Sequence, residues 1–303
     1  VTEEGYVKRT SLRSYSASNG QEFGMKDSDR LLAQYTLNTT DVLLLFTNKG
    51  NYLYSPVHEL PDIRWKELGM HVANLIPIMD GEEIINAVPV ADFEEKLFLL
   101  FITKNGMVKK SELNQYKVQR YSRPLTAINL KGDDEVISVF LTDGTKEIFL
   151  ATHLGYGLRF KEEEVNIVGP RAAGVKGINL KDGDFVASGN ILSNPDEEEI
   201  VIATQRGAIK KMKAEELELT SRAKRGFVML RELKKNPHRI AGAVVVKEGD
   251  QLFIKTEKGK VESKNSNEIN LNDRYSNGSF ILDEGEDGQV ISIWKAASKE
   301  EQS

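Results

Sequence analysis

The sequence predicts an all-β fold, a propeller-like ring of six blades with about four strands each. Three observations support this prediction. A hairpin signature recurs six times, a second strand motif alternates with it, and no long stretch shows the periodicity of an amphipathic helix. Because each repeat of roughly fifty residues buries its faces only against its neighbours, the six units are expected to form one ring rather than two domains.

The hairpin signature is clearest at residues 97–110. An apolar run leads to Asn105-Gly106 and is followed by a second strand that carries Lys109 and Lys110. Asn and Gly tolerate the positive φ of a type I′ turn, so this segment is predicted to be a hairpin whose two lysines are exposed. The Thr and Gly around the turn lie three residues apart in every copy: Thr2/Gly5, Thr47/Gly50, Thr103/Gly106, Thr152/Gly155, Thr204/Gly207 and Thr256/Gly259.

The second motif is a short apolar strand that follows an Arg- and Gly-rich loop. Its copies begin at Leu31, Ile84, Val136, Phe185, Ile240 and Val290. The chain starts within a hairpin, as expected of a fragment of a longer protein, and ends in a strand at 290–294. We expect these two pieces to complete one blade. Residues 1–295 are therefore predicted to be one domain, and the polar residues 296–303 a disordered tail.

Composition limits the classes of function. The chain has no cysteine, no apolar run long enough to span a membrane and no signal peptide, which favours the cytoplasm. The net charge of −5 argues against a strongly basic nucleic-acid binder. The charges are segregated, however: acidic runs such as 162–164 and 196–199 lie in connections, whereas basic residues follow the hairpin turns and occupy the Arg/Gly loops.

No enzyme site is predicted. Gly169 and Gly174 have the spacing of a phosphate-binding loop but lack the Lys-Ser/Thr and the helix that should follow. The four histidines have no second ligand at metal-binding spacing, so no metal is expected. The acidic runs are interpreted as solvated charges rather than paired catalytic carboxylates.

Basic residues recur at equivalent repeat positions. The fourth residue after the repeat glycine is basic in four of six units. Lysines on edge strands also prevent sheets from pairing with other molecules, but paired cations repeated around a ring indicate a basic rim of the kind that binds and bends duplex DNA. The candidate DNA-binding residues are Lys8, Arg9, Lys109, Lys110, Arg120, Arg123, Arg159, Arg171, Lys176, Lys210, Lys211, Arg222, Lys224 and Arg225.

Several phrases resemble a known family. The segments 4–9, 29–32, 47–50 and 171–180 are similar to the C-terminal domain of the A subunits of bacterial type IIA topoisomerases, gyrase and topoisomerase IV. The resemblance implies a six-bladed β-pinwheel whose rim binds and bends double-stranded DNA. It places the cleavage tyrosine, magnesium and ATP elsewhere in the holoenzyme, so no cofactor is expected here. The implied partners are DNA, the separate ATPase B subunit and the N-terminal part of the same polypeptide. The implied location is the bacterial cytoplasm, at the nucleoid.

One departure from the family pattern distinguishes its gyrase branch from its topoisomerase IV branch. Gyrase A subunits carry a box resembling Gln-Arg-Arg-Gly-Gly-Lys-Gly in the first unit, whereas residues 16–24 here lack its two arginines and its lysine. This favours the topoisomerase IV branch, with weaker binding, bending rather than full wrapping, and a role in decatenation and relaxation. DNA contacts are expected on units one, three, four and five. A gyrase-like wrapping domain and a propeller that binds proteins remain the alternatives.

Overall fold

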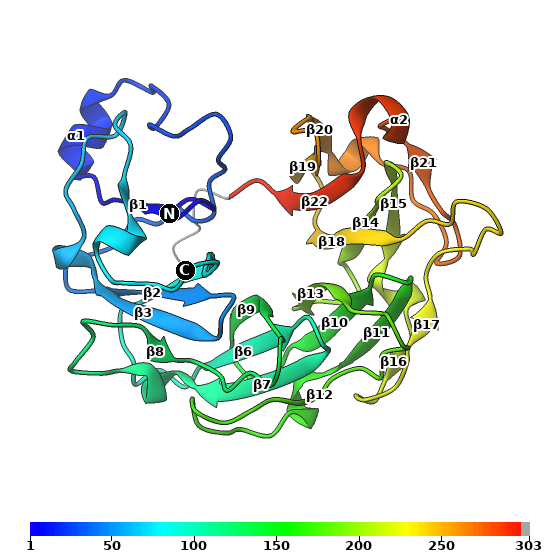
Figure 1. Ribbon diagram of the computed structural model, residues 1–303, viewed down its shortest axis with the longest axis horizontal. Helices are drawn as coiled ribbons and strands as arrows, with labels where there is room; N and C mark the ends of the chain where they lie inside the picture. Colours follow the sequence, from blue (N-terminus) through cyan, green and yellow to red (C-terminus); the bar gives the residue numbers. More distant parts are fainter. Residues whose placement is uncertain (298–303) are drawn as a thin grey trace.

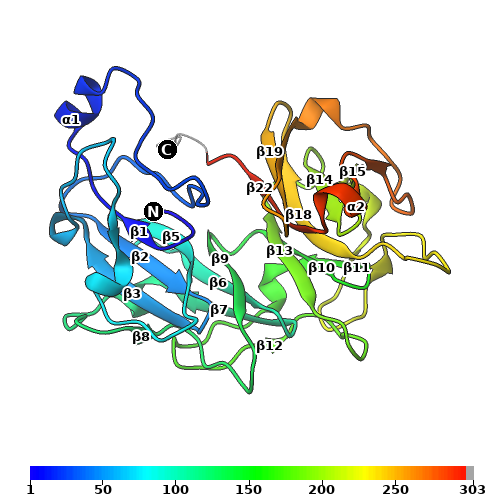
Figure 2. The same ribbon diagram turned by 45° about the horizontal axis from the view of Figure 1, so that its top comes forward.

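The computed structural model describes residues 1–297, which form short β-sheets arranged one after another around a ring (Figures 1 and 2). We number the repeat units one to six in chain order, beginning near residues 1, 42, 98, 147, 199 and 251. The described residues contain no helix that is both long and apolar enough to cross a membrane.

Each complete blade has four strand positions. The first hairpin strands are β2 (Val42–Thr47), β6 (Phe98–Thr103), β10 (Glu147–Thr152), β14 (Glu199–Thr204) and β19 (Gln251–Thr256). The second hairpin strands are β1 (Tyr6–Val7), β3 (Asn51–Pro56), β7 (Met107–Glu112), β11 (Tyr156–Lys161), β15 (Ala208–Lys213) and β20 (Val261–Asn265). The inner strands, which face the middle of the ring, are β5 (Ile84–Val90), β9 (Val136–Thr142), β13 (Val186–Leu192), β18 (Ile240–Val246) and β22 (Val290–Lys295).

The fourth position is supplied by the next unit along the chain. Its short strands are β4 (Met70–His71), β8 (Leu125–Thr126), β12 (Val175–Lys176), β17 (Phe227–Val228) and β21 (Ser279–Phe280), with β16 (Leu219–Thr220) as an addition in unit five. They pair with β1, β3, β7, β11 and β15 respectively, and β16 also pairs with β11. Each unit therefore completes the sheet of the unit before it.

Helices are few and short. The α-helices are α1 (Leu12–Ala17) and α2 (Glu284–Asp287), and a 3-10 turn follows most second hairpin strands: η1 (Val57–Glu59), η3 (Leu113–Tyr116), η4 (Glu162–Glu164), η5 (Ala214–Glu216) and η6 (Ser266–Glu268), with η2 (Val72–Asn74) after β4. The all-β prediction is confirmed.

The recurring Thr and Gly have one structural explanation. In all six units the glycine N–H donates to the carbonyl of the threonine, at 3.0–3.2 Å. The threonine hydroxyl accepts a second bond from the N–H four residues after it, as from Met107 to Thr103 at 3.0 Å. The glycine has positive φ each time, +85° at Gly106, which explains why no other residue replaces it.

The prediction of six blades is wrong, because the ring has five. Units two to six each form a sheet of three to five strands, whereas unit one contributes a two-stranded sheet and the bridge Thr2–Leu31. Among the described residues, unit one has no strand equivalent to the first hairpin strands of the other units. The predicted joining of the last strand to the first hairpin is also wrong, since β22 pairs with β19.

The apolar core is divided among the contacts between units. Five clusters of buried side chains join units one and two, two and three, three and four, four and five, and five and six. The contact between units six and one includes Arg30 lying over the Trp294 ring at 4.4 Å and Lys255 Nζ donating to Ser28 O at 3.5 Å. The ring thus has one joint that, within the described residues, no buried cluster or strand pairing stabilises.

Two predicted boundaries remain. The strand β22 ends at Lys295, as the predicted end of the domain at 295 requires. Residues 296 and 297 are outside regular secondary structure, and 298–303, the rest of the predicted tail, lie outside the described residues.

Candidate nucleic-acid interface

Five segments run along the outside of the ring, and we call them the rim loops: residues 61–71, 117–126, 166–176, 218–228 and 270–280. Each follows a 3-10 turn and ends in a short strand that pairs with the previous unit. Figure 1 shows their strands β8, β12, β16, β17 and β21 around the lower and right-hand margin of the ring. A glycine permits this close approach: a Cβ at Gly174 would lie 2.9 Å from the carbonyl oxygen of Val108 in the preceding unit.

The rim loops contain six exposed residues that the sequence predicted to bind DNA: Arg120, Arg123, Arg171, Lys176, Lys224 and Arg225. A seventh, Arg222, is half-buried and donates from Nη1 to Lys176 O at 2.8 Å. Residues 117–126 and 166–176 contain basic residues and no carboxylate side chain. Units three, four and five therefore present neighbouring cationic segments at equivalent positions.

Backbone hydrogen bonds join the rim loop of one unit to the residues that directly follow the rim loop of the unit before it. Asn129 N, after the loop of unit three, donates to Ala172 O at 3.0 Å, and Ala223 N in unit five donates to Gly177 O at 2.7 Å. Asn179 N donates in turn to Lys224 O at 2.9 Å. The exposed cations of units three to five consequently lie on one continuous structure rather than on three independent loops.

The expectation that the paired lysines are exposed is wrong. Lys109, Lys110, Arg159 and Lys210 are buried, and Lys109 and Lys210 retain about 1% exposure. Hairpin strands in this ring are covered on both faces by adjacent units, so even alternate residues that point in opposite directions are removed from water. A buried cation needs polar partners, and here backbone carbonyl groups supply them.

The fourth residue after the repeat glycine contacts the next unit. Arg9 Nε donates to Leu60 O at 2.9 Å, Lys110 Nζ to Glu162 O at 3.2 Å, Arg159 Nη1 to Leu217 O at 3.0 Å and Lys211 Nζ to Ser266 O at 3.0 Å. In every case the acceptor lies in or beside the 3-10 turn of the following unit. Basic residues recur at this position because they join consecutive units.

The two units without a cation at this position fit the same explanation. Tyr54 in unit two packs against Tyr121 of unit three, with ring centroids 5.1 Å apart. Ser263 lies in unit six, beyond which the ring has no further 3-10 turn in the described chain.

The third residue after the repeat glycine is lysine in alternate units, and it holds the next rim loop. Lys8 Nζ donates to the carbonyl oxygens of Arg64, Trp65 and Glu67 at 2.5–3.1 Å. Lys109 Nζ donates to Ala127 O at 2.5 Å and Pro170 O at 2.6 Å. Lys210 Nζ donates to Met229 O and, at 2.5 Å, to Arg274 O. The ammonium groups of these lysines therefore bind carbonyl oxygens of the protein itself.

Burial changes the titration of these lysines. Loss of hydration lowers the pKa of Lys109 to about 7 and that of Lys210 to about 8. Burial also lowers the pKa of the half-buried Lys8. Burial thus disfavours the charged form of each lysine, while the surrounding carbonyl oxygens favour it.

Arg159 combines both kinds of partner. Its Nε lies 2.5 Å from Glu147 Oε2 and its Nη2 lies 3.3 Å from Oε1, a two-point contact within β10 and β11. The same guanidinium reaches Leu217 O in unit five. Both ion-pair partners are largely buried, so this group has a structural role.

Acidic runs that were interpreted as solvated contain buried members. Glu162 is fully buried and accepts from Thr142 Oγ1 and Lys146 N at 2.8 Å each. Glu198 is also buried and accepts from Asn194 N. Glu162 thus binds groups at the end of unit three and Glu198 binds its own loop, so neither carboxylate pairs with another one for acid–base chemistry.

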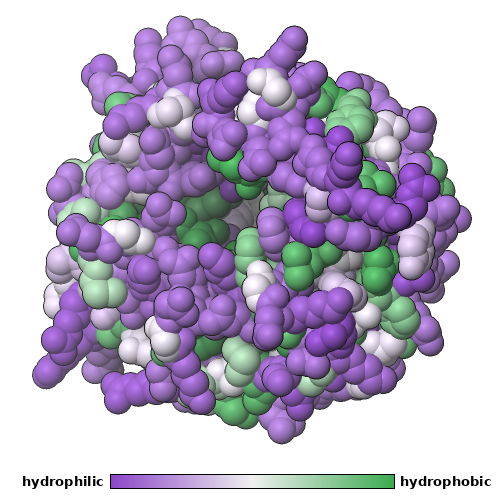
Figure 3. All heavy atoms as spheres, turned by 45° about the vertical axis from the view of Figure 1, so that its right-hand side comes forward, coloured by the Kyte–Doolittle hydropathy of each residue, from purple (hydrophilic) through white to green (hydrophobic). Residues whose placement is uncertain are grey.

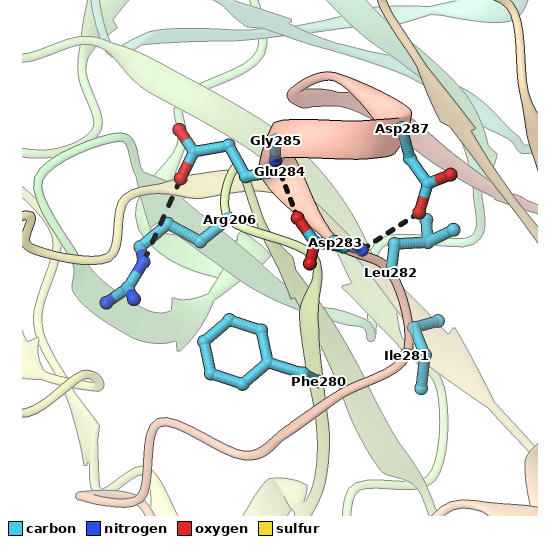
Figure 4. A pocket seen from close by; sticks show the side chains of 8 residues that line it. All are labelled: Arg206, Phe280, Ile281, Leu282, Asp283, Glu284, Gly285 and Asp287. Carbon is cyan, nitrogen blue, oxygen red and sulfur yellow. Dashed lines mark hydrogen bonds and ion pairs between the residues drawn. The ribbon is translucent and has the colours of Figure 1, made fainter.

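The pocket beside α2 is unsuited to phosphate. Figure 4 shows Asp283, Glu284 and Asp287 around it, with Arg206 near Phe280. Arg206 Nε lies 4.0 Å from Glu284 Oε2, and its guanidinium lies over the Phe280 ring at 5.2 Å. The arginine of this pocket is thus already paired, and carboxylates dominate the lining.

Sequence reasoning missed part of the rim. Lys117, Arg64 and Lys66 are exposed members of the rim loops that were not selected as candidates. The signal that identifies them is position: each lies after a 3-10 turn in a rim loop, as the seven selected residues of the rim loops do.

The fold and the rim define a class: a ring of strand-exchanged β-blades with a cationic outer edge. The family model described as "DNA gyrase C-terminal domain, beta-propeller" matches residues 1–21, 41–91, 98–143, 146–193 and 198–247. The chain belongs to this family.

Individual relatives agree with this assignment. The A subunit of DNA topoisomerase 4 from Bacillus subtilis is 60% identical over 97% of this chain, and its counterpart of the same name from Staphylococcus epidermidis is 44% identical over 97%. The chain spans 36% of the length of each of these relatives.

Solved structures are similar over almost the whole ring. The C-terminal domain of DNA topoisomerase IV superposes with a TM-score of 0.95 at 64% identity, covering 98% of this chain and 92% of that one. A DNA gyrase A C-terminal domain superposes with a TM-score of 0.71 at 21% identity, covering 98% of each chain, which shows the shared fold.

Proposed function

We propose that this chain binds duplex DNA without sequence specificity along its rim loops. The observation that carries the proposal is the run of exposed cations on three consecutive, hydrogen-bonded rim loops, two of which contain no carboxylate side chain. Phosphate contacts need positive side chains that water can reach, and they carry no sequence information. The net charge of −5 supports modest affinity, because acidic groups elsewhere repel the duplex.

We further propose that the bound DNA bends around the ring. Units three, four and five face outward in different directions along the curved margin (Figure 1). A straight duplex would meet the cations of one unit, whereas a curved duplex meets all three. The additional phosphate contacts offset the elastic cost of bending, which is on the order of 1–6 kcal/mol for a site of 20–30 base pairs.

The biological setting extends the same proposal. Residues 1–295 would act as the non-catalytic DNA-binding part of a topoisomerase IV A subunit, guiding a DNA segment to the catalytic core for decatenation and relaxation during chromosome segregation. Its partners would be the ATPase B subunit, which is separate, and the rest of its own polypeptide in the bacterial cytoplasm, with ATP and magnesium bound outside this chain. The high identity to two topoisomerase 4 A subunits and the missing arginines and lysine at 16–24 support this setting over gyrase-like wrapping.

The test is a salt titration of DNA binding. A relative 64% identical to this chain has been solved as a separate C-terminal domain, so the chain is suitable for study alone. Fluorescence anisotropy would measure its affinity for a duplex of about 40 base pairs at several salt concentrations. The variant would replace Arg171, Lys176, Lys224 and Arg225 with alanine, and a charge-matched control would replace four exposed lysines outside the rim loops: Lys96, Lys234, Lys235 and Lys247.

We expect the wild-type chain to bind weakly with a steep salt dependence. The rim variant should lose most of its affinity and show a shallower slope, while the control keeps both closer to wild type. A bend angle from energy transfer between the two duplex ends would then test bending. Absence of binding at low salt, or equal losses in both variants, would contradict the proposal and favour a protein-binding ring.

A further inference from the structure

The rim loops carry apolar as well as basic side chains. Of the thirteen large hydrophobic side chains exposed in residues 1–297, eight lie in the rim loops: Leu68, Met70, Ile167, Val175, Leu219, Leu271, Tyr275 and Phe280. These loops make up less than a fifth of the described chain. Exposed apolar residues scattered singly need no explanation, but this concentration does.

Three of them occupy one repeat position. Ile167, Leu219 and Leu271 are separated by 52 residues each. In the structure they lie beside the outer strand of the preceding unit, in parallel bridges to Lys110, Arg159 and Lys211. They retain 51%, 37% and 50% exposure, and none belongs to a buried cluster.

Protection of the sheet edge does not account for these residues. Edge positions are normally occupied by charged residues or proline, which prevent pairing with other molecules. An aliphatic side chain at an edge does the opposite, since it keeps apolar surface in water. Figure 3 shows apolar side chains among hydrophilic ones on the side of the ring that carries units five and six.

The cations in the same loops as Ile167 and Leu219 indicate what covers these residues. Ile167 precedes Arg171 in the same loop, and Leu219 precedes Arg222, Lys224 and Arg225. Along a DNA strand, charged phosphates alternate with sugars whose C–H groups are apolar. Alternating basic and aliphatic side chains match that order, and apolar side chains are established contacts where proteins bend DNA.

We propose that Ile167, Leu219 and Leu271 contact the deoxyribose sugars of the bound duplex, Ile167 and Leu219 next to cations that contact its phosphates and Leu271 where the duplex continues onto unit six. This rests on the proposed function and adds to it, because it divides the binding surface into a salt-dependent and a salt-independent part. Contacts at one position in three successive units would also fix the side on which the duplex meets the ring.

The test separates the two parts by their salt dependence. One variant replaces Ile167, Leu219 and Leu271 with serine. The matched control replaces three exposed hydrophobic residues outside the rim loops, Leu12, Met79 and Ile291, which have 68%, 59% and 54% exposure. Affinity for the 40-base-pair duplex would be measured for both and for the wild type across the salt series, with thermal melting to establish that each chain is folded.

We expect the rim triple variant to bind on the order of ten-fold more weakly at every salt concentration, with the slope of log affinity against log salt unchanged. The control should bind as the wild type does. Wild-type affinity in the folded triple variant would overturn the inference while leaving the proposed function intact, and selective loss of binding to the rest of the topoisomerase would overturn it in favour of a protein interface. A wild-type chain that fails to bind DNA would instead overturn the proposed function.

Discussion

Replacing Arg159 with alanine should destabilise the ring without removing a DNA contact. The change leaves Glu147 buried without its cation and Leu217 O without its donor across the boundary of units four and five. Breaking a buried, hydrogen-bonded ion pair from one side costs about 3–5 kcal/mol. With the unfolding entropy of a chain of this length, that loss lowers the melting temperature by about 5–8 °C.

The assay pairs this change with a matched substitution on the surface. Arg171 is exposed, and its side chain is proposed to contact phosphate. Arg171→Ala should leave the melting temperature within the small range of surface changes and reduce the salt slope of DNA binding by about one unit. Arg159→Ala should lower the melting temperature and leave the salt slope of DNA binding unchanged. Amide exchange would locate the loss of protection in units four and five.

A double variant tests whether the lost stability comes from leaving the buried Glu147 without its cation. Arg159→Leu combined with Glu147→Leu removes both charges, so it should recover part of the stability that Arg159→Ala loses. An Arg159→Ala chain that melts within about 1 °C of wild type and binds DNA with a shallower salt slope would refute the structural role of this residue.

Three further predictions concern titration, the ring joint and the rim turns. The pKa of Lys109 is about 7 in the folded chain and near the ordinary 10.5 in the unfolded chain, so the unfolded chain binds more protons between these pH values. The free energy of unfolding should therefore rise from about pH 7 to about pH 9.5. This rise should be smaller in Lys109→Met when the melting temperatures at the two pH values are compared. Arg30→Ala removes the contact with Trp294 at the joint between units six and one. Small-angle scattering should show a larger radius of gyration, and the loss of stability should stay below about 1 kcal/mol. An unchanged radius would contradict this prediction. Gly278→Ala should lower the melting temperature more than Gly183→Ala does. Both glycines have φ near +77°, but a Cβ at 278 would overlap the Ile209 carbonyl in β15 of the preceding unit, whereas a Cβ at 183 would face open space.

The hairpins could be predicted because their determinants are local. Asn105-Gly106 specifies the turn, and the bonds that hold it run between residues three and four positions apart, as from Gly106 N to Thr103 O at 3.0 Å. A pattern of this kind is complete within one short stretch of sequence. The Arg/Gly loops were identified in the same way, and Arg171 and Lys224 within them are exposed.

The number of blades depends on pairings that no local pattern contains. Each sheet takes its outermost strand from the following unit, and β22 pairs with β19, within its own unit. The repeat count of six therefore exceeds the number of complete sheets. Unit one supplies a rim-type pairing, β1 with β4, without the strands that would make it a blade.

The exposure of the paired lysines was mispredicted for a physical reason. Charge in a sequence ordinarily indicates exposure, because an isolated ammonium is costly to bury. Lys109 and Lys210 are exceptions since backbone carbonyl oxygens surround Nζ, and those acceptors come from residues 18–64 positions away. Recurrence of a charge at one repeat position was therefore evidence of a contact between units as much as of a binding surface.

The buried and exposed cations are connected through the rim loops. Lys109 holds Pro170 O, one residue before the exposed Arg171, so the position of a side chain proposed to bind DNA depends on a buried lysine. Substitution of either residue should weaken binding, which makes affinity alone uninformative about their roles. The salt slope distinguishes them, because it counts the phosphates neutralised. Loss of Lys109 should shift the loop and lower the affinity without changing the salt slope, whereas loss of Arg171 should reduce the slope because it removes a charge that contacts phosphate.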